Sequence, residues 1–221
     1  MDSCVGRAAS LRPLTFAQYP FSATPLLTAH ATGILETCQA IERRTFPKAE
    51  AMELKRELAK PNTFLVACLD LSSTSGSPAQ ASPASLGTKT TSQPTAARSR
   101  RSSARSQPSS KSAAFTGITN PQVRGYAVYV YSKRDGTIRI IKVAVASAHR
   151  NQGIGTRLVQ YILHQVVVAY PGVTKAWLHV DPARPAAYHL YQNLGFQKVS
   201  TIQDYYGHNR HADILERPFT H

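Results

Sequence analysis

An arginine and two glycines form the pattern Arg-x-x-Gly-x-Gly in the second half of the chain, at Arg150, Gly153 and Gly155. The pattern follows a β-branched run and precedes a long apolar run, where a helix is expected to begin. The amino end of a helix carries unpaired N–H groups and a partial positive charge, and both attract anions. We therefore expect the two glycines to keep side chains away from a bound pyrophosphate and the arginine to add a full charge beside it.

Two other phosphate-binding patterns do not fit this loop. A dinucleotide fold requires Gly-x-Gly-x-x-Gly, but the third glycine position holds Leu158, and no acidic residue stands at the usual distance beyond it. A nucleoside-triphosphate loop requires Gly-x-x-x-x-Gly-Lys-Ser/Thr, which is absent. A glycine-rich turn without any ligand remains an alternative, because short motifs often arise by chance.

The elements expected around this loop are helices and strands of ordinary length. Residue spacing indicates two helices over 32–46 and 48–60, and a third from Gly153 to about Ala169. A fourth helix is expected over 184–196, since a proline stands in its first turn and a glycine near its end. Strands are expected over 64–69, 126–131, 138–146, 175–180, 196–206 and 211–219. This order predicts a mixed α/β sheet.

Residues 72–116 differ in composition from the rest of the chain. They consist mainly of Ser, Thr, Ala, Pro and Arg, with almost no residue that could enter a core. Such a segment cannot bury enough apolar surface to offset its ordering entropy, so we expect it to be disordered. Because closure entropy grows only with the logarithm of loop length, the segment can be inserted in a β-hairpin between 64–69 and 126–131. We therefore expect a single domain over 1–221.

The net charge of +14 raises the hypothesis of a nucleic-acid partner. Six of the basic residues lie in 72–115, which contains no acidic residue. This basic segment could contact RNA or the ribosome, or it could be a solvated linker. The three cysteines are widely spaced and lack a CxxC pattern, which favours reduced thiols and predicts no metal site.

The chain gives no indication of a membrane segment. No apolar run reaches the length that spans a bilayer, and the first residues lack the apolar core of a secretory signal. The expected compartment is the cytoplasm, with the nucleus as the alternative. The sequence does not indicate an oligomeric state.

Two motifs at their observed spacing resemble the GCN5-related N-acetyltransferase (GNAT) family. The first is the Arg150 loop between a strand and a helix. The second is WLHVDPARPAAYHLYQNLGFQKV, in which a strand, a helix and Leu-Tyr-x-x-x-Gly-Phe follow in order. The resemblance covers about residues 41–71 and 118–219. It implies the acyl-CoA N-acyltransferase fold, a mixed and mostly antiparallel sheet flanked by helices, and acetyl-CoA as the cosubstrate.

The resemblance also implies which residues contact acetyl-CoA. Main-chain groups of Val143, Ala144 and Val145, on the strand before the loop, are implied to hold the thioester carbonyl. Arg184 occupies a position near the cofactor that often carries asparagine in the family, and it could contact phosphate. The implied pyrophosphate loop consists of Arg150, Asn151, Gln152, Gly153, Ile154, Gly155 and Thr156.

Proton transfer is implied for three side chains. Tyr191 matches a tyrosine that can protonate the leaving thiolate, although it could merely pack on the sheet. His179 matches a histidine that orders the water removing the amine's proton, and a packed strand histidine is the alternative. The subgroup's tyrosine on the strand before the loop is Arg139 here, and arginine cannot act as a base near neutral pH. Glu50 is one residue that could take over that task.

The nearest likeness within the family is to N-terminal (Nα) acetyltransferases, which predicts an α-amino group of a peptide or protein as the acceptor. Phe46, Pro47, Tyr205 and Tyr206 are implied to wall the acceptor site, although such aromatic residues often only pack. The sequence TFPKAE over 45–50 also resembles members that acetylate small amines. We accordingly predict an acetyl-CoA-dependent N-acetyltransferase, with an arylalkylamine or polyamine as the alternative acceptor.

Overall fold

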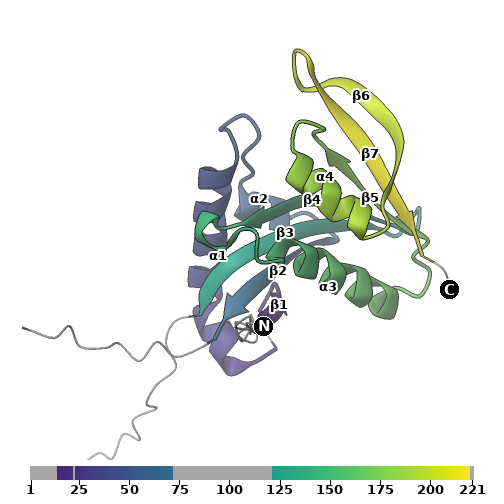
Figure 1. Ribbon diagram of the computed structural model, residues 1–221. Helices are drawn as coiled ribbons and strands as arrows, with labels where there is room; N and C mark the ends of the chain where they lie inside the picture. The colour runs from purple at the N-terminus through teal and green to yellow at the C-terminus, as the bar shows by residue number, and fades with distance from the viewer. Residues whose placement is uncertain (1–13, 22, 72–120, 220–221) are drawn as a thin grey trace, which may run out of the picture. The chain divides into compact units, whose positions relative to one another are not determined.

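The computed structural model describes residues 14–21, 23–71 and 121–219, which carry colour in Figure 1. The strands are β1 (Thr15–Gln18), β2 (Thr63–Asp70), β3 (Gln122–Ser132), β4 (Thr137–Val145), β5 (Lys175–Val180), β6 (Gln197–Gly207) and β7 (Arg210–Pro218). The helices are α1 (Pro25–Thr45), α2 (Leu54–Leu58), α3 (Ile154–Ala169) and α4 (Pro185–Asn193), with a short 3₁₀ turn, η1, at Ser147–His149. None of the described helices has the length and apolar character needed to cross a membrane.

The seven described strands form one sheet in the order β1-β2-β3-β4-β5-β7-β6. Neighbouring strands run antiparallel, except that β4 and β5 run parallel. Helices α1 and α2 cover one face of the sheet, and α3 and α4 cover the other (Figure 1). The predicted fold class, a mixed and mostly antiparallel sheet flanked by helices, is therefore confirmed.

Each face of the sheet has its own apolar core. The α3 face buries Leu158, Ile162 and Val166, which recur at the helical period that the sequence shows. The α1 face buries Ile34 and Cys38 at a similar spacing. Burial of each large aliphatic side chain stabilises the fold by about 2 kcal/mol, so the two cores fix the sheet between the helix layers.

Strands β2 and β3 are the neighbours that the sequence predicts on either side of the inserted segment. They pair antiparallel from Thr63 opposite Val130 to Asp70 opposite Gln122. The segment 72–116, predicted to be disordered, lies outside the described residues. The chain therefore leaves the sheet at the end of β2 and returns on the adjacent strand.

Two elements differ from the sequence predictions. The helix predicted over 48–60 is only Leu54–Leu58, because the preceding residues form a turn in which the Glu50 N–H donates to the Pro47 carbonyl at 2.9 Å. The first helix begins earlier than predicted, since the Thr24 side chain caps it by accepting from the Leu27 N–H at 3.3 Å. Strand β1 was not predicted, because its four residues gain their pairing only from β2.

Strand β4 contains a bulge and an open edge. Val128 of β3 faces Lys142 and Tyr129 faces Ile140, so Ile141 is an extra residue in β4. Strand β5 pairs with β4 only along Thr137–Ile140. Within the part of the chain that the structure describes, the rest of β4 has no strand partner on the β5 side. The two strands separate at this point, and the candidate site lies between them.

Candidate active site

The amino end of α3 has the features expected of an anion site. Gly153 precedes the helix with φ +71°, a left-handed conformation that favours glycine, and no described side chain caps the helix. Arg150 is exposed beside this end, and its Nε donates to the Val145 carbonyl at 3.2 Å. Free N–H groups, a helix dipole and a guanidinium therefore lie together, and this end of α3 fits a pyrophosphate.

The two positions of the loop require glycine for different structural reasons. A Cβ at Gly153 would meet no atom within 4 Å, so this position is open to a ligand. A Cβ at Gly155 would lie 2.8 Å from Leu190 Cδ1 of α4. The Arg-x-x-Gly-x-Gly pattern predicted that both glycines make room for the anion, and for Gly155 the structure gives another reason. It lets α3 pack closely on α4.

The open edge of β4 offers main-chain groups to a ligand. Val143 lines the cavity between β4 and β5, and the Ala144 side chain is buried in the α1-side core. Because β5 pairs no further than Ile140, the main chain of 141–145 can hydrogen-bond an extended ligand as a strand would. This geometry suits the contacts that the sequence analysis assigned to Val143, Ala144 and Val145.

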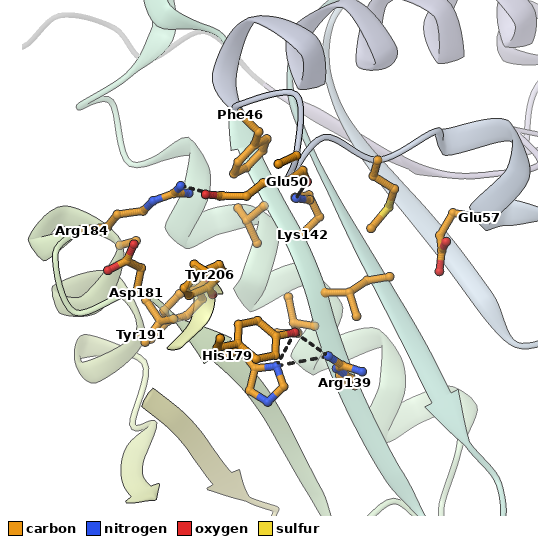
Figure 2. A pocket seen from close by; sticks show the side chains of 18 residues that line it. Phe46, Glu50, Glu57, Arg139, Lys142, His179, Asp181, Arg184, Tyr191 and Tyr206 are labelled. Carbon is orange, nitrogen blue, oxygen red and sulfur yellow. Dashed lines mark hydrogen bonds and ion pairs between the residues drawn. The ribbon is translucent and has the colours of Figure 1, made fainter. Parts of the chain in front are cut away.

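A cavity of about 510 Å³ opens beside this edge (Figure 2). It brings together side chains from the α1–α2 segment, β4, β5, α4 and β6. Pro47 and the residues 150–156 are not among those that line it. The predicted site residues that line it are Phe46, Glu50, Val143, His179, Arg184, Tyr191, Tyr205 and Tyr206.

His179 lies on the cavity face of β5, as the alternation of that strand predicts. Its neighbours Leu178 and Val180 are buried on the other face. Its Nδ1 lies 3.1 Å from both Arg139 Nη2 and the Tyr205 hydroxyl. Burial and then the Arg139 charge lower the pKa of His179 below 6.5. The ring is therefore neutral at pH 7, and since arginine only donates, Nδ1 accepts and Nε2 carries the proton.

Glu50 lies in an ion-pair cluster that joins three elements. Its Oε2 accepts from Arg184 Nη2 at 2.7 Å, and its Oε1 accepts from Arg210 Nη1 at 2.8 Å. Arg210 also donates to Asp181 Oδ2 at 2.6 Å. Burial raises the pKa of Glu50, but the hydrogen bonds and charges of the two arginines outweigh it, so the pKa falls below 4.5. A carboxylate held in this way is a weak base.

This cluster also explains which groups the Arg184 side chain contacts. The family resemblance implied a contact between Arg184 and the cofactor, whereas its guanidinium here binds Glu50 and lies 5.5 Å from the centre of the Phe46 ring. Figure 2 shows the Arg184 and Glu50 side chains meeting at one side of the cavity. Arg184, Glu50 and Arg210 therefore connect the α1–α2 segment to the start of α4 and to β7.

Two tyrosines of the cavity keep their protons. Tyr191 is buried, and burial followed by the neighbouring Tyr206 raises the pKa of its hydroxyl. Burial and then Tyr205 raise the pKa of Tyr206 to about 12. The Tyr191 ring packs edge-on against Phe196 at 5.8 Å. Tyr191 is therefore protonated at neutral pH, where it cannot serve as a base, and its raised pKa makes it a weaker acid than a free tyrosine.

Glu42 and Lys142 hold the α1–α2 segment against β4, a role that the sequence analysis missed. Glu42 is fully buried and accepts from the Met52 N–H at 2.8 Å and from the Tyr126 hydroxyl. Lys142 Nζ lies 3.3 Å from Glu42 Oε1 and donates to the Glu50 carbonyl at 2.9 Å. The available signal was Glu42 itself, which stands four residues after Cys38 on the apolar stripe of α1.

Arg210 was also missed, and no pattern in the sequence indicates it. It is one of many basic residues, and its partners lie far away in the chain.

Within the described ranges no group of three or more His, Cys, Asp or Glu side chains could hold a metal ion. Cys38 and Cys68 are buried free thiols in different cores.

Comparison with known proteins places these features in context. The model of the acetyltransferase (GNAT) family matches residues 86–196. An N-alpha-acetyltransferase of Sulfurisphaera tokodaii is 29% identical over 79 residues, which is 36% of this chain and 47% of that protein. The [Ribosomal protein bS18]-alanine N-acetyltransferase of Escherichia coli K12 is 30% identical over 67 residues, or 30% of this chain and 44% of that protein. The chain thus spans about half the length of these curated relatives.

Solved structures show the same fold at low identity. Arabidopsis thaliana NAA60 in complex with a bisubstrate analogue has a TM-score of 0.56 and 14% identity, with 94% of this chain and 100% of that chain covered. An acetyltransferase of the GNAT family from Desulfovibrio desulfuricans, described as putative, has a TM-score of 0.56 and 13% identity, with 93% and 99% covered. At these identities the likeness concerns the fold alone.

Proposed function

Because the chain belongs to the GNAT acetyltransferase family, we propose that it transfers an acetyl group from acetyl-CoA to a primary amine. We propose further that this amine is the α-amino group of a protein or peptide. The observation that carries the proposal is the separation of β4 from β5 beyond Ile140 and Leu178. It places an unpaired strand edge, His179 and Tyr191 around one cavity.

Two parts of the main chain fit acetyl-CoA. The uncapped start of α3 suits its pyrophosphate, with Gly153 open to the ligand and Arg150 beside it. The edge of β4 over 141–145 suits its extended arm and its carbonyl. When bound, acetyl-CoA supplies an acetyl thioester, which a neutral amine can attack. A fixed N–H donor at the carbonyl oxygen contributes about 3 kcal/mol to such a reaction.

The side chains of the cavity are suited to the proton transfers. Tyr191 keeps its proton at neutral pH and can donate it to a leaving thiolate. His179 is neutral and carries its proton on Nε2, so it can orient a water molecule beside the amine. Glu50 is held by two arginines and shapes the cavity instead of accepting the proton.

A peptide acceptor is supported by the wall of the cavity and by the relatives. Tyr205 is exposed at the cavity and Tyr206 is half-buried, so both hydroxyls can face an extended backbone. Phe46, on the α1–α2 segment, lines the same cavity (Figure 2). One curated relative is named N-alpha-acetyltransferase, and the name of the other specifies the alanine of a ribosomal protein.

The test is release of free thiol from acetyl-CoA with a panel of peptides, lysine-containing peptides, polyamines and arylalkylamines. We expect turnover with peptides that have a free α-amine and not with the same peptides blocked at that amine. Tyr191→Phe should lower kcat by about 10- to 100-fold with an unchanged melting temperature. Tyr188→Phe is the matched control, since that hydroxyl is on the same helix but donates to Asp213. Turnover confined to small amines would overturn the peptide acceptor.

The basic segment offers a second use of the same assay. Because Asp70 and Gln122 are paired neighbours in the sheet, a short turn can replace residues 73–114 without moving β2 or β3. We propose that the shortened chain keeps its turnover with free peptides. A contact of the segment with RNA or the ribosome would then appear only as weaker co-sedimentation with ribosomes, whereas lost turnover would show that the segment takes part in catalysis.

A further inference from the structure

Most charged side chains around the cavity have a partner of opposite charge. Glu50 pairs with Arg184 and Arg210, and Arg210 also pairs with Asp181. Lys142 pairs with the buried Glu42. Glu57, at the edge of the cavity, pairs with Lys60 at 2.6 Å. Among the described residues this leaves Arg139 as the cavity cation that has no carboxylate within 4 Å.

Arg139 is held firmly on one side and is free on the other. Its Nη2 lies 3.1 Å from His179 Nδ1 and 3.5 Å from the Tyr205 hydroxyl. Its guanidinium carbon lies 4.8 Å from the centre of the Trp177 ring, which stacks against it. Among the residues that the structure describes, its Nε and Nη1 have no hydrogen-bond acceptor, and neither is a buried unsatisfied atom. Arg139 lines both this cavity and a neighbouring hollow beside Trp177, so these two nitrogens, with three N–H bonds, are open to a ligand.

We infer that Arg139 binds a carboxylate of the acceptor, so that the preferred acceptors are peptides with Asp or Glu in their first two residues. The inference rests on the proposed function, because it identifies the substrate of that same site. An arginine fork matches the two oxygens of a carboxylate, and a position fixed by His179 and Trp177 loses little freedom on binding. The pairing also supplies the counter-charge that no described residue provides.

The distance from Arg139 to His179 limits where this carboxylate can stand. The water held by His179 sits at Nε2, whereas Arg139 Nη2 lies 3.1 Å from Nδ1, so the imidazole ring and the water separate the amine from the guanidinium. The side chains of the first and second residues of an extended peptide reach that far, because each residue advances by about 3.3 Å. Acidic residues further along the peptide would lie too far from the Arg139 guanidinium to bind it.

The experiment compares pairs of peptides that differ only in charge, with Asp against Asn and Glu against Gln at position one or two. We expect kcat/KM to favour the acidic member of at least one pair by about tenfold, as for a hydrogen-bonded charge pair. Arg139→Gln should abolish the preference, and Arg139→Lys should keep part of it. Arg134→Gln, an exposed change in the β3–β4 turn, should leave the preference intact. Equal rates within every pair, or a preference that survives Arg139→Gln, would overturn the inference.

A binding measurement separates this inference from the proposed function. Trp177 is the single tryptophan of the chain and contacts Arg139, so its fluorescence reports occupation of the fork. Titration of each peptide pair should give a lower Kd for the acidic member whether or not an acetyl group is transferred. Acidic preference in binding without turnover would support the fork and refute the transferase. Turnover without acidic preference would support the transferase and refute the contact between Arg139 and a carboxylate.

Discussion

The start of α3 and the cavity beside β5, which we propose to be two parts of one site, are built from different chemistry. At the start of α3 the main chain provides the contacts, and glycine is important there for its missing side chain. In the cavity the contacts come from charged and aromatic side chains, which five parts of the chain supply. The first region suits the pyrophosphate of acetyl-CoA, and the second suits the acceptor that we propose.

The two regions also differ in how tightly they are coupled to the rest of the molecule. The loop at α3 depends on a single close packing, that of Gly155 on Leu190. The cavity depends on two polar clusters, one around Glu42 and one around Glu50. Substitutions in these places should therefore damage different steps, and four of them test this difference.

The largest effect on stability is expected for Glu42→Gln. The change leaves Lys142, which is 12% exposed, without its carboxylate and weakens the bond from Tyr126. Breaking a buried ion pair in this way should cost about 3 kcal/mol of unfolding free energy, measured by urea denaturation. The folded fraction should still bind CoA with normal affinity, because Glu42 lies on the acceptor side. Glu36→Gln, an exposed change on the same helix, is the control.

Gly155→Val should come next, with a cost of about 2 kcal/mol and a much weaker affinity for CoA. The added atoms would press on Leu190 Cδ1, which lies 2.8 Å from an ideal Cβ, and on Val145 Cγ2 at 3.8 Å. The double variant Gly155→Ala with Leu190→Ala should be less destabilised than Gly155→Ala alone. A double variant that gains nothing would refute the packing role of Gly155.

Gly153→Ala is the companion change, and it should separate ligand binding from packing. The position has open space but a positive φ, so the variant should lose only about 1 kcal/mol of stability. Its affinity for CoA should fall by a larger factor than this cost implies, because a methyl group enters the anion site. Calorimetric titration with CoA measures this, and normal affinity would exclude the α3 start as the pyrophosphate site.

Glu50→Gln should have a moderate effect, about 1 kcal/mol of stability and a severalfold higher KM for the peptide. The pKa of Glu50 is lower in the folded protein than its ordinary 4.5. Its ionised form therefore stabilises the protein above that pH, and this stabilisation is lost as the pH falls through the folded value. Below pH 4.5 the variant should lose less stability than the wild type, as thermal melting can show. If the stabilities of the variant and of the wild type fall in parallel with pH, the ion pairs of Glu50 do not stabilise the fold.

The smallest effect concerns the titration of His179. Burial and then Arg139 lower its pKa in the folded protein below 6.5, so the unfolded chain binds the proton more readily. Stability is therefore lost as the pH falls below 6.5. Arg139→Gln should return the pKa part of the way to 6.5, as NMR of the imidazole can follow, and the acid limb of kcat/KM should move to higher pH. An unmoved titration would mean that burial alone sets the pKa.

The contrast between the two regions explains what the sequence could predict. The α3 loop and β5 were located correctly because they depend on local patterns, namely glycine spacing and strict alternation. The roles expected for the cavity side chains His179, Tyr205 and Tyr206 came only from resemblance. Arg210 and Lys142 stayed hidden, because their roles arise from contacts across 160 and 92 residues of chain. Strand β1 was not predicted for the same reason, because it pairs only with β2, which lies far away in the chain.

The extra residue of β4 gives the strand a tolerance for one change in its length. Ile140 enters the core under α3, and Ile141 enters the core under α1. Without Ile141, Ile140 and Lys142 would be consecutive opposite Tyr129 and Val128, and the register on both sides of the bulge would be kept. Arg139 would then keep its face of the sheet, so we expect a one-codon deletion at Ile141 to remove the bulge and to leave the sheet intact.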